Sequence, residues 1–405
     1  MADCPRLFKA QHKLKSLNNA NNGAELAQVL QLNSLYTDRV LQDIRKEHGS
    51  WDILQSRQAR GVWDEITLMH FRAAAADRAR NFIEAYTCQL TCYNAFLRIF
   101  RNMAQWSVPV IYTLSHDLSD VAQRADRQLG CGNSQGSKLE EATRIINQGF
   151  SMCMTDREPL LDKTRKWGTY HMANILFALY VRHKAYNLCD SMVRALRAAE
   201  LPPMGQFPMS DQVAFRYYRG MLAFRNEKYK SARDDLEFAL EHCHRDSYNN
   251  KTRILIYLTP ILMAEGKSPH SRLLRRYPPI KAMYGELVKA AKAGNLREFD
   301  SLMQEKEQQL VNAGTYIAVE RVRRVAVRQL IRKIYIMSGQ QSRVAFKLLC
   351  DGFMAAGVED IDISEMESIL ADLIFAGYLK GYLAHDHGLA VLSKQQPFPP
   401  LFSIA

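Results

Sequence analysis

Four arginines recur at helical spacing in the stretch between Glu320 and Tyr335: Arg321, Arg324, Arg328 and Arg332. On a helix, which turns by about 100° per residue, their side chains fall within one arc of about 80°. The opposite side is apolar and is formed by Val322, Val325, Ala326, Leu330, Ile334 and Met337. The spacing therefore predicts an amphipathic helix that carries an arginine stripe.

Guanidinium groups bind phosphate or carboxylate oxygens through paired hydrogen bonds, so the stripe is a candidate nucleic-acid contact. Five further basic residues extend this candidate set: Arg272, Arg275, Arg276, Lys281 and Lys380. Such contacts would go mainly to phosphate, so they would tolerate any base sequence and weaken with salt. The sequence leaves an alternative open. These side chains could instead pair with acidic residues of a neighbouring helix, or could only form a solvent-exposed surface that makes the helix soluble.

An acidic partner protein competes for the same positive charge. We predict that an extended acidic chain lies across the last helical repeats, on a set that overlaps the one above: Lys251, Arg253, Arg272, Arg275 and Arg276. The affinity of such a chain would be limited by the entropy that it loses on ordering.

Motifs of known catalytic sites do not occur in the sequence. There is no phosphate loop GxxxxGK[ST], no GxGxxG after a strand, no HExxH and no GxSxG. Cys88 and Cys92 could share one helix face, but no histidine or second cysteine pair accompanies them as zinc ligands. We therefore expect no enzyme activity, no cofactor and no metal, and we expect reduced, mostly buried cysteines.

Composition indicates a globular chain with an uneven charge. Its 405 residues are 47% apolar and carry a net charge of +12, enough for more than one packed unit. Between Lys251 and Ala345, 18 Lys and Arg stand against 7 Asp and Glu, whereas from Phe346 onward 3 stand against 8. No run approaches the roughly 18 apolar residues of a membrane span, so we expect a soluble intracellular protein.

Helix-type periodicity dominates from Ala24 to Tyr335 and predicts a mainly α fold. Long helices are expected over Trp63–Arg101, Val110–Leu129, Leu139–Met154, Trp167–His183 and Tyr186–Glu200. Residues 130–138 and 201–211 are expected to be loops. Helical hairpins are expected with turns near Lys184, at Asn226 and Glu227, and at Gly294 and Asn295. This pattern is typical of a tetratricopeptide-like helical repeat stack.

The pattern changes after Gly339 to helix, helix and β-hairpin, which predicts a C-terminal winged helix with Glu320–Met337 as its first helix. Its third helix, Ile363–Phe375, would expose small, acidic and apolar side chains, which suit a protein contact better than DNA bases. We therefore predict a protein interface on this helix and on the wing: Ser368, Asp372, Phe375, His385 and His387. The tail PFPPL is either a polyproline-like ligand or a strap packed on the winged helix.

Several segments together resemble the PCI domain of proteasome-lid, signalosome and initiation-factor scaffolds: the hairpin AAKAGNLREFDSLM, the helices VRQLIRKIY and MESILADLIFAGYLKGYL, the wing, and the closing VLSKQQPFPPL. A finer resemblance, over nearly the whole chain, is to the Thp-one-like family of PCI domain-containing protein two. It is carried by YLTPILMAEGKSPHSRLLRRY and by the terminal SKQQPFPPL.

This resemblance implies a non-enzymatic subunit of transcription-and-export complex two, which links transcribed genes to messenger RNA export. The implied partners are a Sac-three-type scaffold (the germinal-centre-associated nuclear protein) and the small acidic protein DSS-one. The resemblance also implies that two winged helices lie side by side and bind RNA or DNA without sequence specificity. The implied location is the nucleus, at the nuclear pore, with some cytoplasmic pool.

Three parts are expected along the chain: N-terminal helical repeats at 1–209, the helical-repeat part of the PCI domain at 210–319, and its winged-helix part with the tail at 320–405. Two other functions remain open. One is a signalosome-subunit-twelve-like PCI scaffold in splicing or transcription, and the other is an autonomous nucleic-acid-binding protein.

Overall fold

The computed structural model describes residues 5–46, 61–130, 137–358 and 361–401. This part of the chain is helical apart from one small sheet, which confirms the mainly α fold with helical repeats and a C-terminal winged helix. It forms two compact units, Met1–Tyr218 and Arg219–Ala405. The boundary between the units lies inside one helix, and the three parts expected from the sequence stay a prediction.

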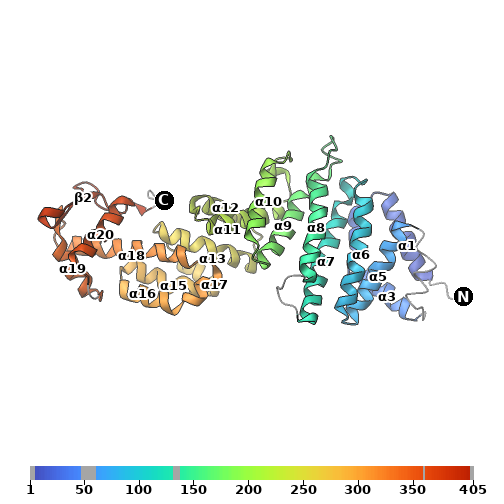
Figure 1. Ribbon diagram of the computed structural model, residues 1–405, viewed down its shortest axis with the longest axis horizontal. Coiled ribbons are helices and arrows are strands. Elements are labelled where there is room, and N and C mark those ends of the chain that lie inside the picture. Colours follow the sequence, from blue (N-terminus) through green and yellow to red (C-terminus); the bar gives the residue numbers. More distant parts are fainter. Residues whose placement is uncertain (1–4, 47–60, 131–136, 359–360, 402–405) are drawn as a thin grey trace. The chain divides into compact units, whose positions relative to one another are not determined.

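The first unit consists of helices that pack against their neighbours in the chain, and Figure 1 shows α5 to α8 side by side. The helices are α1 (Pro5–Asn19), α2 (Gly23–Val29), α3 (Leu35–Lys46), α5 (Val62–Arg78), α6 (Phe82–Phe100), α7 (Val108–Leu129), α8 (Lys138–Met154), α9 (Thr169–Arg182), α10 (Tyr186–Ala198) and the start of α11 (Met209–Arg225). The expected turn near Lys184 joins α9 to α10, where Lys184 has a φ of +57°.

One long helix that the sequence predicts is in fact two helices. Between Trp63 and Arg101 the chain turns at Arg80, which has a φ of +59°. Asn81 then caps α6, because its side chain accepts a hydrogen bond of 3.3 Å from the backbone N–H of Glu84. The apolar pattern continues through the turn, so periodicity alone concealed this break.

The second unit begins with helical hairpins. Its helices are α12 (Tyr229–His242), α13 (Tyr248–Ala264), α14 (Ser271–Arg276), α15 (Pro278–Ala293), α16 (Leu296–Glu305), α17 (Glu307–Ala313) and α18 (Tyr316–Met337). Both turns expected here are present, since Glu227 has a φ of +56° and Gly294 a φ of +62°. The Gly294 turn lies against α18, and a Cβ at this position would stand 2.7 Å from the backbone nitrogen of Leu330.

The winged helix continues from α18, its first helix, and contains one strand that the sequence did not reveal. Its elements are β1 (Arg343–Ala345), α19 (Phe346–Ala355), α20 (Ile363–Phe375), β2 (Gly381–Ala384) and β3 (Leu389–Leu392). The antiparallel sheet has the order β1-β3-β2, with Val391 opposite both Arg343 and Tyr382. A strand as short as β1 has no readable alternation, and only its pairing with β3 defines it.

Helix α18 connects the repeats to the winged helix. It packs against α13, α15 and α16 of the repeats and against α19 of the winged helix. Apart from Ala318, its buried apolar residues belong to one hydrophobic core that also includes residues of α15, α20 and β3. The predicted apolar side is confirmed except for Met337, which is 86% exposed. The helix therefore fixes how the arginine stripe is presented.

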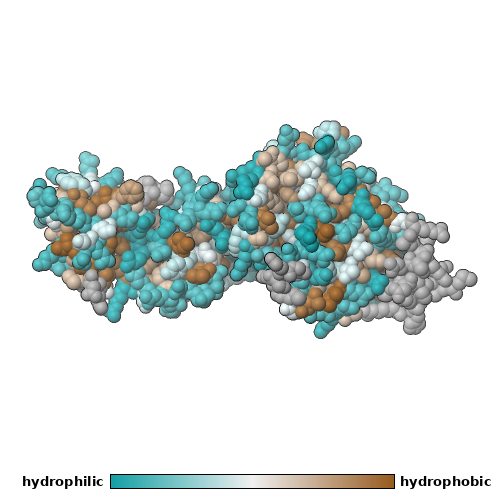
Figure 2. Space-filling view, viewed as in Figure 1, coloured by the Kyte–Doolittle hydropathy of each residue, from teal (hydrophilic) through white to brown (hydrophobic). Residues whose placement is uncertain are grey.

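The face drawn in Figure 2 is largely hydrophilic, with scattered apolar patches over both units. Within the described ranges, no helix combines the length and the apolar character that crossing a membrane requires.

Candidate functional site

The arginine stripe on α18 is not one continuous surface, because its members meet different neighbours. Arg321 is exposed, and its guanidinium carbon lies 4.6 Å from the centre of the Tyr229 ring. Arg324 is half-buried and pairs with Asp372 of α20, with Nε 3.0 Å from the carboxylate. Arg332 is exposed, and among the residues that the structure describes it makes no ion pair.

Arg328 departs from the predicted stripe. It is only 5% exposed and donates hydrogen bonds to the backbone carbonyls of Tyr378, at 3.1 Å, and Pro399, at 2.7 Å. Burial and the neighbouring Arg332 lower the pKa of this guanidinium below its ordinary value. Arg328, which the sequence predicts as a nucleic-acid contact, is therefore buried instead, because the C-terminal tail covers this turn of the helix.

The C-terminal tail is a strap, the second of the two alternatives for PFPPL. The ring of Phe398 lies 5.5 Å from that of Tyr335, and Pro399 is buried. The backbone N–H of Lys380 donates to the Pro397 carbonyl at 2.9 Å. Beyond the winged helix, Leu401 packs closely on Gly266 after α13. The strap therefore links the winged helix to the repeats of the second unit.

The basic residues on and around α14 are placed for contact with an anion. Arg272, Arg275, Arg276 and Lys281 are all exposed. Arg276 lies over the ring of Tyr277, with its guanidinium carbon 5.9 Å from the ring centre. None of the four has a carboxylate partner among the described residues. We call Arg272, Arg275 and Arg276 the α14 cluster, and its role in binding nucleic acid or an acidic chain stays a prediction.

The remaining basic candidates lie on different elements. Lys251 is half-buried and Arg253 exposed, both in the first turns of α13. Lys380 is exposed and immediately precedes β2. Their predicted contacts also stay predictions.

The predicted protein interface on the winged helix is exposed, with one internal ion pair and one internal hydrogen bond. Phe375 is 94% exposed, and Ser368 is also exposed. Asp372 forms an ion pair with Arg324. A residue predicted to contact a protein partner is thus paired with one predicted to contact nucleic acid. His385 lies 2.9 Å from the carboxylate of Glu367, and His387 is exposed at the wing. Whether a partner binds here stays a prediction.

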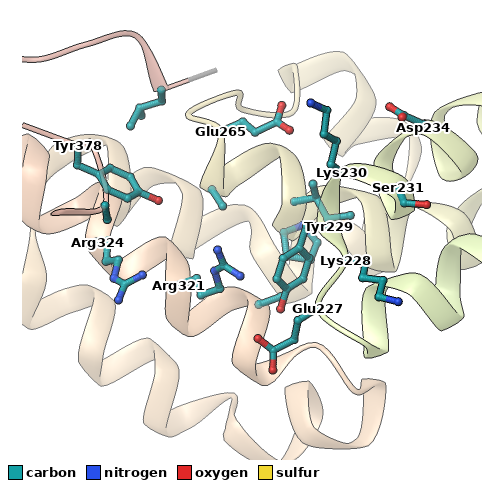
Figure 3. Close-up of a pocket in the computed structure, with 16 residues that line it drawn as sticks. Glu227, Lys228, Tyr229, Lys230, Ser231, Asp234, Glu265, Arg321, Arg324 and Tyr378 are labelled. Carbon is teal, nitrogen blue, oxygen red and sulfur yellow. The ribbon is translucent and has the colours of Figure 1, made fainter. Parts of the chain in front are cut away.

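A groove of about 690 Å³ lies beside Arg321 and Arg324 (Figure 3). One wall is the turn and first residues of α12, and another is the C-terminal end of α13. The third wall combines α18, the end of α20 and Leu401 of the strap. Figure 3 shows Arg321 between Tyr229 and Tyr378. Burial raises the pKa of Tyr378, and the positive charges of Arg321 and Arg324 oppose this shift.

Sequence reasoning missed the residues that complete the groove: Lys228, Tyr229, Lys230, Tyr378 and Leu401. Tyr378 and Leu401 are brought to Arg321 only by the packing of α20 and of the strap. The basic and aromatic run from Lys228 to Lys230, at a predicted hairpin turn, is the one signal that the sequence offered.

The described cysteines lie in the interior of the protein. The described cysteines are buried and unpaired, and burial raises the pKa of Cys88, Cys92, Cys153, Cys189 and Cys350, which keeps these thiols neutral. Cys4 and Cys131 lie outside the described residues. In the described ranges, no three His, Cys, Asp or Glu side chains are grouped as a metal site.

Comparison with known proteins connects this structure to one family. The PCI domain family matches residues 295–394, which run from the α15–α16 turn to the end of the sheet. PCI domain-containing protein 2 of Xenopus laevis is 34% identical over 84% of this chain and 86% of its own length. Protein CSN12 homolog of Mycosarcoma maydis is 32% identical, over 97% of this chain and 95% of its own length.

A third relative, PCI domain-containing protein 2 homolog of Drosophila melanogaster, is 30% identical over 95% of this chain and 98% of its own length. The similarity therefore extends through the N-terminal helices as well as the PCI domain. Relatives with the two names match at nearly the same identity, so identity does not separate them.

Proposed function

This chain belongs to the PCI family that includes PCI domain-containing protein 2 and the CSN12 homologues, and from this premise we propose that it is a non-enzymatic adaptor in nuclear messenger RNA export. PCI proteins act in multi-subunit complexes, and this chain is a PCI scaffold protein. The proposed complex is transcription-and-export complex two at the nuclear pore. Its other proposed members are a Sac-three-type scaffold and the small acidic protein DSS-one.

The observation that carries this proposal is the similarity to PCI domain-containing protein 2, which covers most of both chains. The nearly fully exposed aromatic side chain of Phe375 on α20 also supports it, since such a side chain suits a contact with another protein. A winged helix whose third helix exposes Phe375 and Ser368 and holds an Arg324–Asp372 ion pair suits a protein contact. It offers few basic groups to the base edges of DNA.

A nucleic-acid contact by this adaptor would use exposed arginines that make no internal ion pair. The α14 cluster and Arg332 meet this condition within the described part of the chain. Their contacts would go to phosphate and would therefore be sequence-tolerant and sensitive to salt.

Purification of the endogenous complex tests the proposal. The protein, tagged at its own locus, should co-purify from nuclear extract with a Sac-three-type scaffold and DSS-one in stoichiometric amounts. A chain that elutes alone and binds RNA tightly would contradict the adaptor function and indicate an autonomous nucleic-acid-binding protein.

The match to the CSN12 homologues over 97% of this chain favours a second candidate function. In that case the chain would be a signalosome-subunit-twelve-like scaffold in splicing or transcription. The same purification separates the two functions, because recovery with a different PCI partner and without the export scaffold would support the second.

A further inference from the structure

We propose that Ser268, in the loop between α13 and α14, is a phosphorylation site for a proline-directed protein kinase and that its phosphate binds the α14 cluster. Such kinases require a proline immediately after the serine or threonine that they modify. The serine oxygen takes the γ-phosphoryl group of ATP, ADP leaves, and the hydroxyl hydrogen is released as a proton. The inference goes beyond the proposed adaptor function and does not depend on it.

The sequence contains two hydroxyl residues that directly precede a proline, and the structure separates them. They are Thr259, before Pro260, and Ser268, before Pro269. Thr259 is 2% exposed and lies inside α13, so a kinase cannot reach its hydroxyl in the folded chain. Ser268 is half-buried and lies outside the helices, in a loop whose neighbouring side chains are partly or fully exposed. Only the second of the two sites is therefore accessible in the folded protein.

The backbone at Ser268 is suited to the extended form in which kinases bind their substrates. A residue before proline is sterically kept out of the helical region and favours an extended conformation. Neither Ser268 nor Pro269 makes a backbone hydrogen bond with another described residue. The hydroxyl of Ser268 also has no hydrogen-bond partner in the described part of the chain. Binding of this segment by a kinase would therefore break no hydrogen bond at the modified residue.

Positive charge beside this loop lacks an internal acid. The α14 cluster, Arg272, Arg275 and Arg276, is exposed and has no carboxylate partner among the described residues. Lys267, by contrast, already pairs with Glu265 at 2.9 Å. A phosphoserine carries nearly two negative charges at neutral pH, and its oxygens bind guanidinium groups through paired hydrogen bonds. The arginines of the cluster are thus the cations available to such a phosphate.

The nearest arginine along the chain is Arg272, four residues after Ser268. At most about 14 Å of chain separates their Cα atoms, so a long guanidinium side chain can meet a phosphate on the serine. Phosphorylation would thereby neutralise part of the α14 cluster. It would remove positive charge from a surface to which the proposed nucleic-acid contact is assigned.

Phosphate uptake by the folded full chain tests the modification. The purified protein is incubated with a cyclin-dependent kinase, which is proline-directed, and with radiolabelled ATP, and mass spectrometry locates the modified residue. The native chain should be phosphorylated at Ser268 and not at Thr259, and Ser268→Ala should lose the label. Ser271→Ala is the matched control, because Ser271 is an exposed serine in the same region that no proline follows. It should take up as much phosphate as the native chain.

The modification is overturned if the folded native chain takes up no phosphate at Ser268, or if Ser268→Ala and the native chain are labelled equally. Circular dichroism should show that the variants are folded, so that loss of label reports on the site.

Phosphorus NMR of the phosphorylated chain tests the ion pair. Nearby guanidinium groups favour the dianion, so the second pKa of the phosphate should lie below the value of about 6 for a free phosphoserine. Arg272→Ala combined with Arg275→Ala should return this pKa to about 6. Lys289→Ala combined with Lys292→Ala removes the same number of exposed charges from α15 and should leave the pKa low. An equal phosphate pKa in the native chain and in the arginine double variant would overturn the binding of the phosphate by the α14 cluster.

Discussion

At the scale of single residues, Arg328 shows how a buried cation is held without an acid. Among the described residues its guanidinium bonds two backbone carbonyls and lies over the Phe398 ring, and it makes no ion pair. Carbonyl dipoles replace part of the hydration that a buried charge loses. Since both carbonyls belong to segments beyond α18, this arginine fixes the strap rather than binding a ligand.

Arg328→Ala should destabilise the strap. Two buried carbonyls would lose their donors, at about 1–3 kcal/mol each in the free energy of unfolding. Limited proteolysis should then cleave the C-terminal tail faster than in the native chain, and the thermal transition should shift downward. Arg332→Ala, an exposed arginine on the same helix, is the control and should change neither result. Equal cleavage rates in Arg328→Ala and the native chain would show that the hydrogen bonds of Arg328 do not hold the tail.

Asp117 should make the first unit less stable as the pH rises. Burial raises the pKa of this carboxyl from about 3.8 to about 7, although its hydrogen bond from the Leu32 backbone N–H opposes the shift. A raised pKa means that the folded state binds a proton more tightly than the unfolded state. The stabilisation is therefore complete below the unfolded pKa and is lost as the pH rises through about 7.

Asp117→Asn keeps an oxygen to accept the Leu32 hydrogen bond and cannot ionise. Thermal melts should show the variant more stable than the native chain near pH 8, and this difference should shrink steadily as the pH falls toward the unfolded pKa of about 3.8. Glu140→Gln, at an exposed carboxylate in the same unit, is the control for the loss of one charge. A constant difference in melting temperature across this pH range would contradict the role of Asp117.

At the scale of elements, the α15–α16 turn packs so closely on α18 that it leaves no room for a side chain at Gly294. Gly294 combines a φ of +62° with a close approach to the backbone of α18. Gly294→Ala should therefore lower the free energy of unfolding by more than the roughly 1 kcal/mol of left-handed strain alone. Gly339→Ala provides the comparison, since Gly339 has a φ of +82° with open space around a Cβ. Equal chemical-denaturation midpoints for the two variants would contradict this packing effect.

The exposed face of α20 should serve binding rather than stability. Phe375 is 94% exposed, so Phe375→Ala removes almost no packing and should leave the melting temperature unchanged. Recovery of partner proteins in a tagged purification should fall, because exposed aromatic residues are frequent binding hot spots. Leu370→Ala, at a buried position of the same helix, should instead lower the melting temperature, because it leaves a cavity in the core. A full yield of partners with Phe375→Ala would place the interface elsewhere.

For the whole molecule, periodicity was enough to predict the helical repeats, the hairpin turns and most of the winged helix. It failed where long-range contacts decide the structure. The tail buries Arg328 from 71 residues away in the chain, and the pairing with β3 defines β1. The groove could not be foreseen either, since Tyr229, Tyr378 and Leu401 meet Arg321 only after α12, α18 and the strap have packed.

The uneven charge of the chain leads to a prediction about salt. The region from Lys251 to Ala345 contains 18 Lys and Arg against 7 Asp and Glu, yet burial or ion pairing removes Arg323, Arg324 and Arg328 from a phosphate-binding surface. If the assembled complex binds RNA through this chain, the α14 cluster should carry most of the contact. Each neutralised phosphate contributes about 0.7 to the slope of log affinity against log salt for single strands.

Arg272→Glu combined with Arg275→Glu should therefore weaken RNA binding by the purified complex and reduce that slope by about 1.4 if both arginines contact phosphate. The measurement is a filter-binding titration of single-stranded RNA at several salt concentrations. Lys289→Glu combined with Lys292→Glu reverses the same number of exposed charges on α15 and should change the slope much less. If both double variants reduce the affinity equally and leave the slope unchanged, the effect is one of net charge, and the α14 cluster does not contact phosphate.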